Sequence, residues 1–206
     1  MTNPIYFYEP RYGHGLAHDP FNAIVGPRPI GWISSRSAAG VDNLAPYSFF
    51  NAFNYTPPII GFSSIGHKDT LRNIEQTGEF AWNLVTQPLA KAMNQSCASV
   101  PPDISEFELA GLTPVSSRLI SAPRVLECPV SFECRCTQIV QLHTIAGDKV
   151  PTWLVLGEVL ALYIESQLLI DGVYDTANAG HLLRGGGPAD YFTIGPEQLF
   201  KMPRPV

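Results

Sequence analysis

The sequence predicts a mainly β protein in which six to eight short strands form a barrel with short flanking helices. Apolar runs of strand length are separated by turn residues along the chain. The 19 prolines and 17 glycines are spread through the 206 residues and mark frequent turns between short strands. The helical signals are short, and this combination favours a barrel over a parallel sheet.

A chain of this length is expected to form one domain, 1–206, with a substantial core. Residues 1–22 are irregular and rich in tyrosine and phenylalanine. We expect them to form an ordered N-terminal arm that packs on the body or on a partner subunit. Residues 195–206 are expected to form a C-terminal arm.

The composition excludes several classes of protein. Apolar residues make up 45% and charged residues 15%, which indicates that much surface is buried, as in an oligomer. A net charge of −5 without a basic run argues against a nucleic-acid partner. No apolar stretch is long enough for a membrane span, and the N-terminus lacks the pattern of a signal peptide. We therefore expect a cytoplasmic protein with four reduced cysteines.

The first strands follow a proline-rich lead-in. Residues 23–25 are apolar and predict the start of a strand, and two prolines keep the next residues extended. Residues 30–35 predict a strand and 37–40 a turn. Residues 44–50 are apolar but contain a proline, so they predict an edge or irregular strand whose backbone groups are not all paired.

Two strands and two short helices follow. Residues 59–63 predict a buried strand, which a loop connects to a helix. Asp69 predicts the N-cap of that helix, and Gly78 predicts its end. Residues 80–85 predict another strand, and 88–95 predict a short helix with proline in its first turn.

The C-terminal half is expected to be mostly β after a loop-rich segment, 97–123. Residues 130–137 alternate, with Val130, Phe132, Cys134 and Cys136 on one face. The other predicted elements are strands at 139–145 and 152–164 joined by a hairpin turn at 147–149, a short helix at 177–184, a break at 185–188 and a strand at 191–194.

The segment GFSSIGHKDT, 61–70, predicts a phosphate site. A strand ends in serines, a loop brings Lys68, and a helix begins. First-turn amides, hydroxyl groups and the ammonium group could together bind a phosphate. A capped helix after a solvated loop is the alternative interpretation of the same residues.

The segments PRPIGWISS and NLAPYSFFN form a second candidate site. Two adjacent strand-like segments with small residues and a proline would leave backbone amides and carbonyls free to bind the polar edge of a heterocycle. Trp32, Tyr47 or Phe49 would cover its face. On this pattern alone, ordinary core aromatics are the favoured interpretation.

Other motifs indicate no further chemistry. The glycines at 185–187 lack the spacing of a dinucleotide fingerprint and predict a turn. Cys134 and Cys136 are expected to be buried thiols rather than metal ligands, and the serines lack the context of a nucleophile elbow. Glu106 and Glu108 are interpreted as solvated surface. We predict no catalytic side chain and no metal ligand.

The ordered segments PRPIGWISS, NLAPYSFFN, TPPIIGFSS, KDTLRNI and GEFAWNLV resemble the flavin reductase-like family of FMN-binding split barrels. FELAGLTPV, LGEV and LLRGGGPADYF are also similar to it, so the resemblance runs from about Ile24 to Ile194. It implies a six-stranded antiparallel split β-barrel with Greek-key connectivity and short flanking helices. It also implies a homodimer with FMN at or near the dimer interface.

The resemblance further implies which residues bind FMN. The isoalloxazine ring would lie against 32–35 and 43–48, and serine, lysine and threonine side chains would meet the phosphate. An arginine from the same or the other chain would be a further contact. The implied FMN-binding residues are Trp32, Ile33, Ser34, Ser35, Asn43, Ala45, Pro46, Tyr47, Ser48, Ser63, Ser64, Lys68, Thr70, Asn83 and Arg184.

Two residues depart from the family pattern. His67 stands where many relatives carry arginine, which would weaken phosphate binding or make it depend on pH. Trp82 replaces a smaller aliphatic residue and would narrow the pocket or fill a gap in the core. Arg28 and Arg36 flank the first predicted strand and are the candidates for stabilising negative charge at the N1–O2 edge of a flavin.

Three functions remain open at this point. The first is an NAD(P)H-dependent flavin reductase that transfers hydride through bound FMN, with NADH or NADPH as transient donor. It could supply reduced flavin to a monooxygenase. Because flavin carries the redox chemistry, such an enzyme needs no catalytic triad. The second is an FMN electron carrier or flavin-binding protein without nicotinamide activity, and the third is a flavin-less split-barrel binding module.

Overall fold

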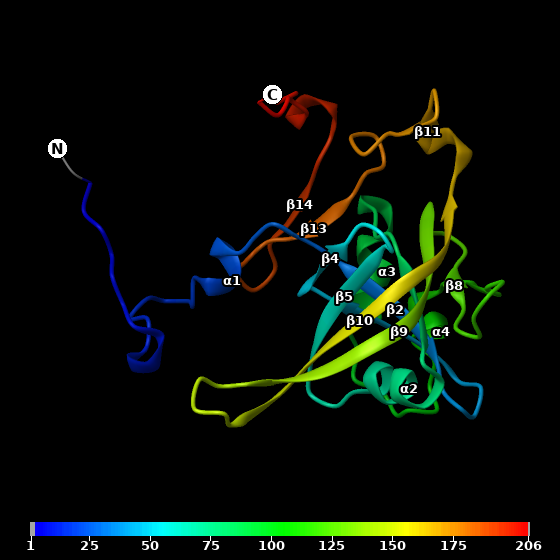
Figure 1. The fold of residues 1–206 in the computed structure, drawn as a ribbon, viewed down its shortest axis with the longest axis horizontal. Coiled ribbons are helices and arrows are strands. Elements are labelled where there is room, and N and C mark those ends of the chain that lie inside the picture. The colour runs from blue at the N-terminus through cyan, green and yellow to red at the C-terminus, as the bar shows by residue number, and fades with distance from the viewer. Residues whose placement is uncertain (1–2, 206) are drawn as a thin grey trace.

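The computed structural model describes residues 3–205, and its centre is a curled antiparallel sheet (Figure 1). Met1, Thr2 and Val206, the ends of the two predicted arms, lie outside the described residues. The seven strands of the sheet are β2 (Gly31–Arg36), β3 (Asp42–Tyr47), β4 (Phe50–Asn54), β5 (Ile59–Ile65), β6 (Glu79–Asn83), β9 (Val130–His143) and β10 (Lys149–Ile164). Their hydrogen-bonded order is β3-β2-β6-β9-β10-β5-β4.

The two edge strands of this sheet follow each other directly in the chain. β3 ends at Tyr47 and β4 begins at Phe50, and three Cα steps span at most about 11 Å. The sheet must therefore curl until its opposite edges lie side by side. The described ladders do not join β3 to β4, so the barrel is split, as predicted. Counted as one bent strand, β3 and β4 reduce the barrel to six strands.

Short elements flank the barrel, and none of the described helices is long and apolar enough to span a membrane. α2 packs on β2, and α4 packs on β3. The helical elements are η1 (Pro10–Tyr12), α1 (Phe21–Ile24), α2 (Asp69–Thr77), η2 (Gln87–Leu89), α3 (Ala90–Gln95), α4 (Glu106–Ala110), η3 (Ser166–Leu168) and η4 (Pro196–Gln198). The short strands are β1 (Arg28–Pro29), β7 (Pro114–Val115), β8 (Arg124–Val125), β11 (Leu169–Ile170), β12 (Val173–Tyr174), β13 (Leu182–Arg184) and β14 (Tyr191–Thr193).

β2 separates two apolar clusters. Ile33 packs inside the barrel with Phe62, whereas Trp32 packs on the outer face with Met93 of α3 and Phe107 of α4. Successive side chains of a strand point to opposite faces, so a strand covered on both sides shows no alternation of polar and apolar residues. This explains why β2 is almost continuously buried.

Several predicted local features are confirmed. Gly78 ends α2 in the left-handed conformation, with φ of 71°, and its N–H donates to Ile74 O at 2.8 Å. Gly147, with φ of 89°, lies in the hairpin turn between β9 and β10. Trp82 fills a core gap. Its ring stacks on that of Phe50 with 5.6 Å between the ring centroids, and its centroid lies 4.6 Å from that of Phe132.

Other local predictions are wrong. Residues 23–25 do not begin a strand, because α1 includes the first two of them. The segment 177–184 is not a helix: Gly180 has φ of 67°, and β13 pairs with β1 and β14. Residues 139–145 are not a separate strand, because β9 runs without a break to His143. The segment 97–123 is loop-rich as predicted, with α4 and β7 as short regular elements.

The first part of the N-terminal arm does not pack on the body of its own chain, whereas its end does. Asn22 O accepts from Arg28 Nη1, and His18 and Asp19 line a cavity together with Arg184. The first part extends away from the barrel (Figure 1), and Ile5, Tyr6, Phe7 and Tyr12 are exposed. For this first part, the finding corrects the expectation of an arm covering its own domain. Packing on a partner subunit stays a prediction.

The closure of the barrel is sensitive to the size of residue 31. A Cβ atom at Gly31, on β2, would lie 2.8 Å from Phe50 Cδ2, on β4. We expect Gly31→Val to lower the free energy of unfolding by about 1–3 kcal/mol, because overpacking forces strands apart. Urea unfolding measures this, with Gly195→Val in the C-terminal arm as control. Equal free energies of unfolding of the two variants would contradict the close approach of Gly31 to Phe50.

Candidate functional site

A cavity of about 340 Å³ lies between the edge strand β3, the N-terminus of α2 and the segment that precedes α4. The predicted site residues that line it are Asn43, Ala45, Pro46, Tyr47, Lys68 and Thr70. The lining residues that the sequence did not indicate are Asp69, Ser96, Cys97, Ala98, Ser99, Val100 and Glu106. The cavity thus joins parts of both candidate sites.

The N-terminus of α2 opens without a side-chain cap. Lys68, not Asp69, occupies the N-cap position, and no described side chain donates or accepts a capping hydrogen bond there. Asp69 is instead the first helical residue and pairs with Arg72. Because the first amides of an α-helix have no intrahelical acceptors, this end is suited to bind an anion.

Thr70 joins this helix to the edge strand. Asn43 Nδ2 donates to Thr70 Oγ1 at 2.8 Å, and both side chains are buried. The Thr70 hydroxyl group therefore accepts from the protein and retains its own hydrogen for donation. The bond fixes the start of α2 against β3, so the two walls of the cavity hold a defined separation.

The hydroxyl group of Tyr47 is a buried polar atom without a hydrogen-bond partner among residues 3–205. Burial raises the pKa of Tyr47, and the nearby hydroxyl groups of Thr70 and Ser64 oppose this rise. A buried hydroxyl group left unsatisfied is costly. Tyr47 lines the cavity, so a polar ligand group there would supply the missing partner.

Glu106 is a buried carboxyl group in the cavity wall. It is 6% exposed, and its Oε2 accepts from Leu44 N at 3.0 Å. Burial raises the pKa of Glu106, and hydrogen bonds from backbone N–H groups partly oppose this rise. The interpretation of Glu106 as solvated surface is therefore wrong. The signal was its place beside Phe107 and Ala110 on the buried face of α4.

The expectation of free backbone groups holds only for one of the two strands. β2 pairs with β3 on one side and β6 on the other, so the backbone of 32–35 is largely committed, and this part of the prediction is wrong. Trp32 and Ile33 are fully buried, and Trp32 Nε1 donates to Ser96 Oγ at 2.9 Å. The core interpretation of Trp32 therefore applies, with a contact to the cavity segment.

Asn83 is a buried structural hub rather than part of the cavity wall. Its Nδ2 donates to Trp32 O at 3.2 Å and Ser34 Oγ at 3.1 Å. Its Oδ1 accepts from Val125 N at 2.9 Å and Ser131 Oγ at 3.0 Å. The amide has no capacity left for a ligand.

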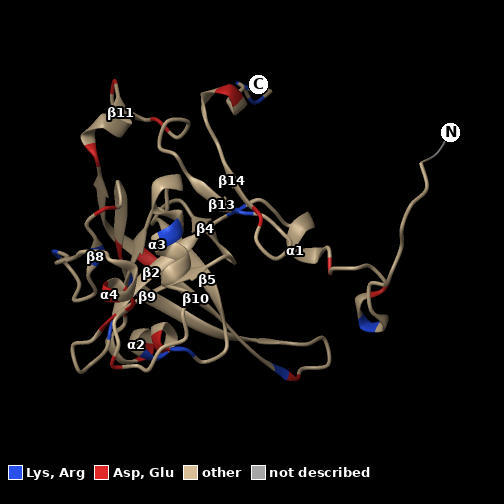
Figure 2. Ribbon diagram, turned by 180° about the vertical axis from the view of Figure 1, so that it is seen from behind, with Lys and Arg blue, Asp and Glu red and all other residues tan. Residues whose placement is uncertain are grey.

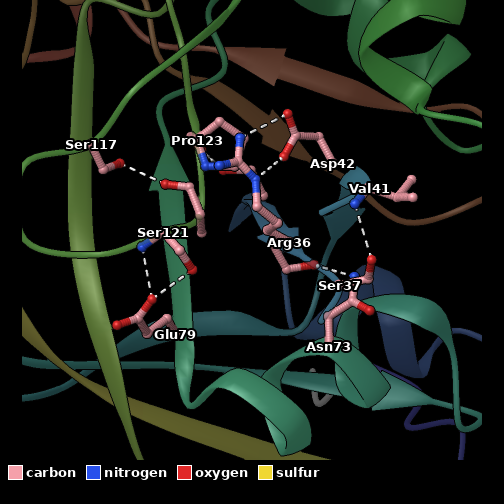
Figure 3. A network of polar contacts seen from close by, with 12 residues as sticks. Arg36, Ser37, Val41, Asp42, Asn73, Glu79, Ser117, Ser121 and Pro123 are labelled. Carbon is pink, nitrogen blue, oxygen red and sulfur yellow. Dashed lines mark hydrogen bonds and ion pairs between the residues drawn. The ribbon is translucent and has the colours of Figure 1, made fainter. Parts of the chain in front are cut away.

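The remaining predicted serines also lie outside the cavity lining. Ser34 donates to Pro123 O, and Ser35 Oγ accepts from Asn73 Nδ2 at 3.2 Å (Figure 3 shows this region). Ser64 is buried and donates to Gly66 O at 2.9 Å. Ser63 lines a different cavity, beside β4. Ser34, Ser35 and Ser64 are thus buried and hydrogen-bonded within the protein.

Arg184 and Ser48 lie at another cavity, together with Arg28. Arg28 stands directly opposite Arg184 in the β1–β13 ladder and donates from Nε to Ser48 O at 2.9 Å. Arg184 donates to backbone carbonyls of its own glycine-rich loop, including Asp190 O at 2.7 Å. Burial lowers the pKa of Arg28, and the neighbouring Arg184 lowers it further.

Arg36 and His67 are also turned away from the cavity. Arg36 forms a bidentate pair with Asp42 at 2.6 and 3.1 Å (Figure 3), and this hydrogen-bonded pairing raises its pKa. His67 Nε2 lies 2.8 Å from Glu75 Oε2. Charged residues of both signs gather at α2 (Figure 2), where Lys68 lines the cavity and Arg72 pairs with Asp69.

Comparison with known proteins shows the family. The model of the flavin reductase-like domain matches residues 26–179. An uncharacterized protein of Aquifex aeolicus is 38% identical over 151 residues, which are 71% of this chain and 74% of that protein. The chain belongs to the flavin reductase-like family, as the sequence resemblance implied.

Solved structures agree with this assignment. Nitrilotriacetate monooxygenase component B from Bacillus cereus is similar, with a TM-score of 0.86 and 29% identity over 98% of this chain and 100% of that chain. A protein from Shewanella frigidimarina, assigned as a flavin reductase with a split barrel domain, has a TM-score of 0.79 and 26% identity over 90% of each chain.

The buried carboxyl group of Glu106 should make stability depend on pH. Its pKa is raised in the fold above the ordinary value of about 4.3, so the folded state retains a proton that the unfolded chain loses. Stability should therefore fall as pH rises between the unfolded and folded pKa values, by at most about 1.4 kcal/mol per pH unit.

Urea unfolding of the flavin-free protein between pH 4 and pH 8 measures this effect. Glu106→Gln keeps an oxygen acceptor for Leu44 N–H but cannot ionise, so the difference between wild type and variant isolates Glu106. Parallel pH profiles would show that the carboxyl group does not retain its proton on folding.

Proposed function

We propose that this protein is an FMN-binding, NAD(P)H-dependent flavin reductase. The observation that carries the proposal is the cavity in which an uncapped helix start with Lys68 and Thr70 faces an edge strand with an unsatisfied tyrosine hydroxyl group. Family membership supports a flavin as the ligand. The Shewanella frigidimarina protein, assigned as a flavin reductase, supports the activity.

The phosphate of FMN fits the α2 end of the cavity. Three kinds of donor converge there: the free first-turn amides, the Thr70 hydroxyl group and the Lys68 ammonium group. Charge-assisted hydrogen bonds of this kind are the strong ones. Asp69 also lines the cavity, but its pairing with Arg72 offsets its charge.

The polar part of the isoalloxazine ring fits the edge strand. Among the strands that the structure describes, β3 is paired on one side only, by β2. Pro46 offers a carbonyl group without an N–H. Asn43, Ala45 and Tyr47 complete this wall. We assign FMN binding to these residues with Lys68 and Thr70. Asn83 and the buried serines would act by holding the walls in place.

The protein contributes binding and orientation rather than a proton-transfer dyad. FMN, when bound, supplies the hydride-accepting and hydride-donating centre. Lys68, Thr70 and the α2 amides would hold its phosphate, and the backbone of β3 would set the orientation of the ring. The apolar cluster that includes Trp32 packs on β2 and β3 and would hold this wall in place.

A homodimer that serves a monooxygenase is part of the proposal. The Bacillus cereus relative is component B of a monooxygenase, which supports a partner that uses reduced flavin. The long β9–β10 hairpin carries exposed apolar residues, Val140, Leu142 and Ile145, as do both arms. Such a surface is typical of an interface between subunits.

The purified protein should bind FMN, and NADH or NADPH should bleach the absorbance of the bound flavin. The expected result is flavin absorbance on titration with FMN, then loss of that absorbance in anaerobic stopped-flow mixing with a nicotinamide nucleotide. Binding without bleaching would instead favour the electron-carrier function. A protein that takes up no FMN would leave only a flavin-less binding module.

Lys68→Ala should weaken FMN binding. Loss of one charge-assisted hydrogen bond, worth about 1.5–3 kcal/mol, raises Kd by roughly 10- to 150-fold. Quenching of flavin fluorescence measures Kd. Lys91→Ala is the matched control, because Lys91 is exposed on α3 and does not line the cavity. Equal Kd values for the two variants would remove Lys68 from the site.

A further inference from the structure

A second cavity of about 290 Å³ continues the first one along α2. Asn43 and Asp69 line both cavities, so the two are neighbours across the start of the helix. The phosphate site proposed at Lys68 and Thr70 lies at this boundary. A ligand that extends beyond a phosphate there would enter the second cavity.

Two apolar walls from different segments line this second cavity beside α2, whose Arg72 and Asn73 also line it. Ala39 and Val41 come from the turn after β2, and Pro102 and Ile104 come from the segment before α4. Ile104 is 41% exposed, so this apolar surface is open to a ligand. A flat heterocyclic base between such walls would remove apolar surface from water.

The turn that carries the first wall is fixed in position. Ser37 Oγ accepts from Val41 N at 3.0 Å, and Arg36 and Asp42 pair across the base of the turn (Figure 3). A wall held in this way loses little conformational freedom when a ligand binds.

The rim of the second cavity carries polar groups that suit a ribose. Asp103 and Gln76 line it, and neither side chain is hydrogen-bonded to another side chain or backbone group in the described part of the chain. A carboxylate accepts well from ribose hydroxyl groups, as in dinucleotide-binding sites. Arg72 also lines the cavity and pairs with Asp69, so Asp103 is the carboxylate left to accept from the ribose.

We propose that the second cavity is a subsite for adenosine 5′-phosphate. The base lies between the walls at Ala39 and Ile104, and Asp103 accepts from the ribose. This inference rests on the proposed phosphate site at Lys68. The moiety has two sources, FAD and NADH.

Calorimetric titration of the flavin-free protein with AMP tests the subsite, because the phosphate site at Lys68 is then free to bind AMP. We expect AMP to bind more tightly than 2′-deoxy-AMP, because Asp103 accepts from the ribose, and we expect Asp103→Asn to narrow the difference between the two Kd values. Ala39→Trp should weaken AMP binding at least tenfold and leave the Kd of FMN unchanged. Ala189→Trp, in the exposed turn between β13 and β14, is the matched control.

Two further arms identify the source of the adenosine. Ala39→Trp should raise the Kd of FAD for the flavin-free protein if FAD is the source, or the KM of NADH for the FMN-loaded protein if NADH is. The subsite proposal would be wrong if AMP did not bind, or if the two tryptophan variants bound AMP with equal affinity. It would also be wrong if Ala39→Trp changed neither the Kd of FAD nor the KM of NADH. Failure to bind FMN at all would instead overturn the proposed function.

Discussion

The fold depends on one geometric constraint, the short connection between the two edges of the sheet. Only Ser48 and Phe49 separate β3 from β4, which are the outermost strands of the hydrogen-bonded order. The sheet closes because the chain leaves no other arrangement, and the close approach of Gly31 to Phe50 is the steric consequence. The large aromatic cluster around Trp82 then fills the interior that closure creates.

The same constraint produces the site. A barrel closed by a full ladder has no edges, whereas a split barrel keeps the outer side of β3 unpaired by any strand. Pro46 is tolerated there because an edge strand needs no donor on that side. Part of this edge is occupied by Glu106, which accepts from Leu44 N, and the rest faces the cavity. Folding and ligand recognition thus use the same strand.

Local signals in the sequence predicted much of the fold, and non-local contacts account for what they missed. Gly78 and the β9–β10 turn carry their own conformational signal. The segment 177–184 does not, because pairing with β1 and β14 decides its structure. In the site, Lys68 and Thr70 adjoin a recognisable helix start. Ser96 to Val100 and Glu106 reach the cavity only through the packing of α3 and α4 on β2 and β3.

The prediction of Asp69 as the N-cap of α2 was wrong, and the physical reason bears directly on ligand binding. Asp, Asn, Ser and Thr at an N-cap satisfy the first amides of a helix from within the protein. α2 instead places Lys68 at that position and directs Asp69 to Arg72, so its amides stay available and a positive side chain stands beside them. Together with the unsatisfied Tyr47 hydroxyl group, this leaves stabilising interactions unmade in the protein alone. A ligand with an anionic group at one end and a polar edge at the other can make both.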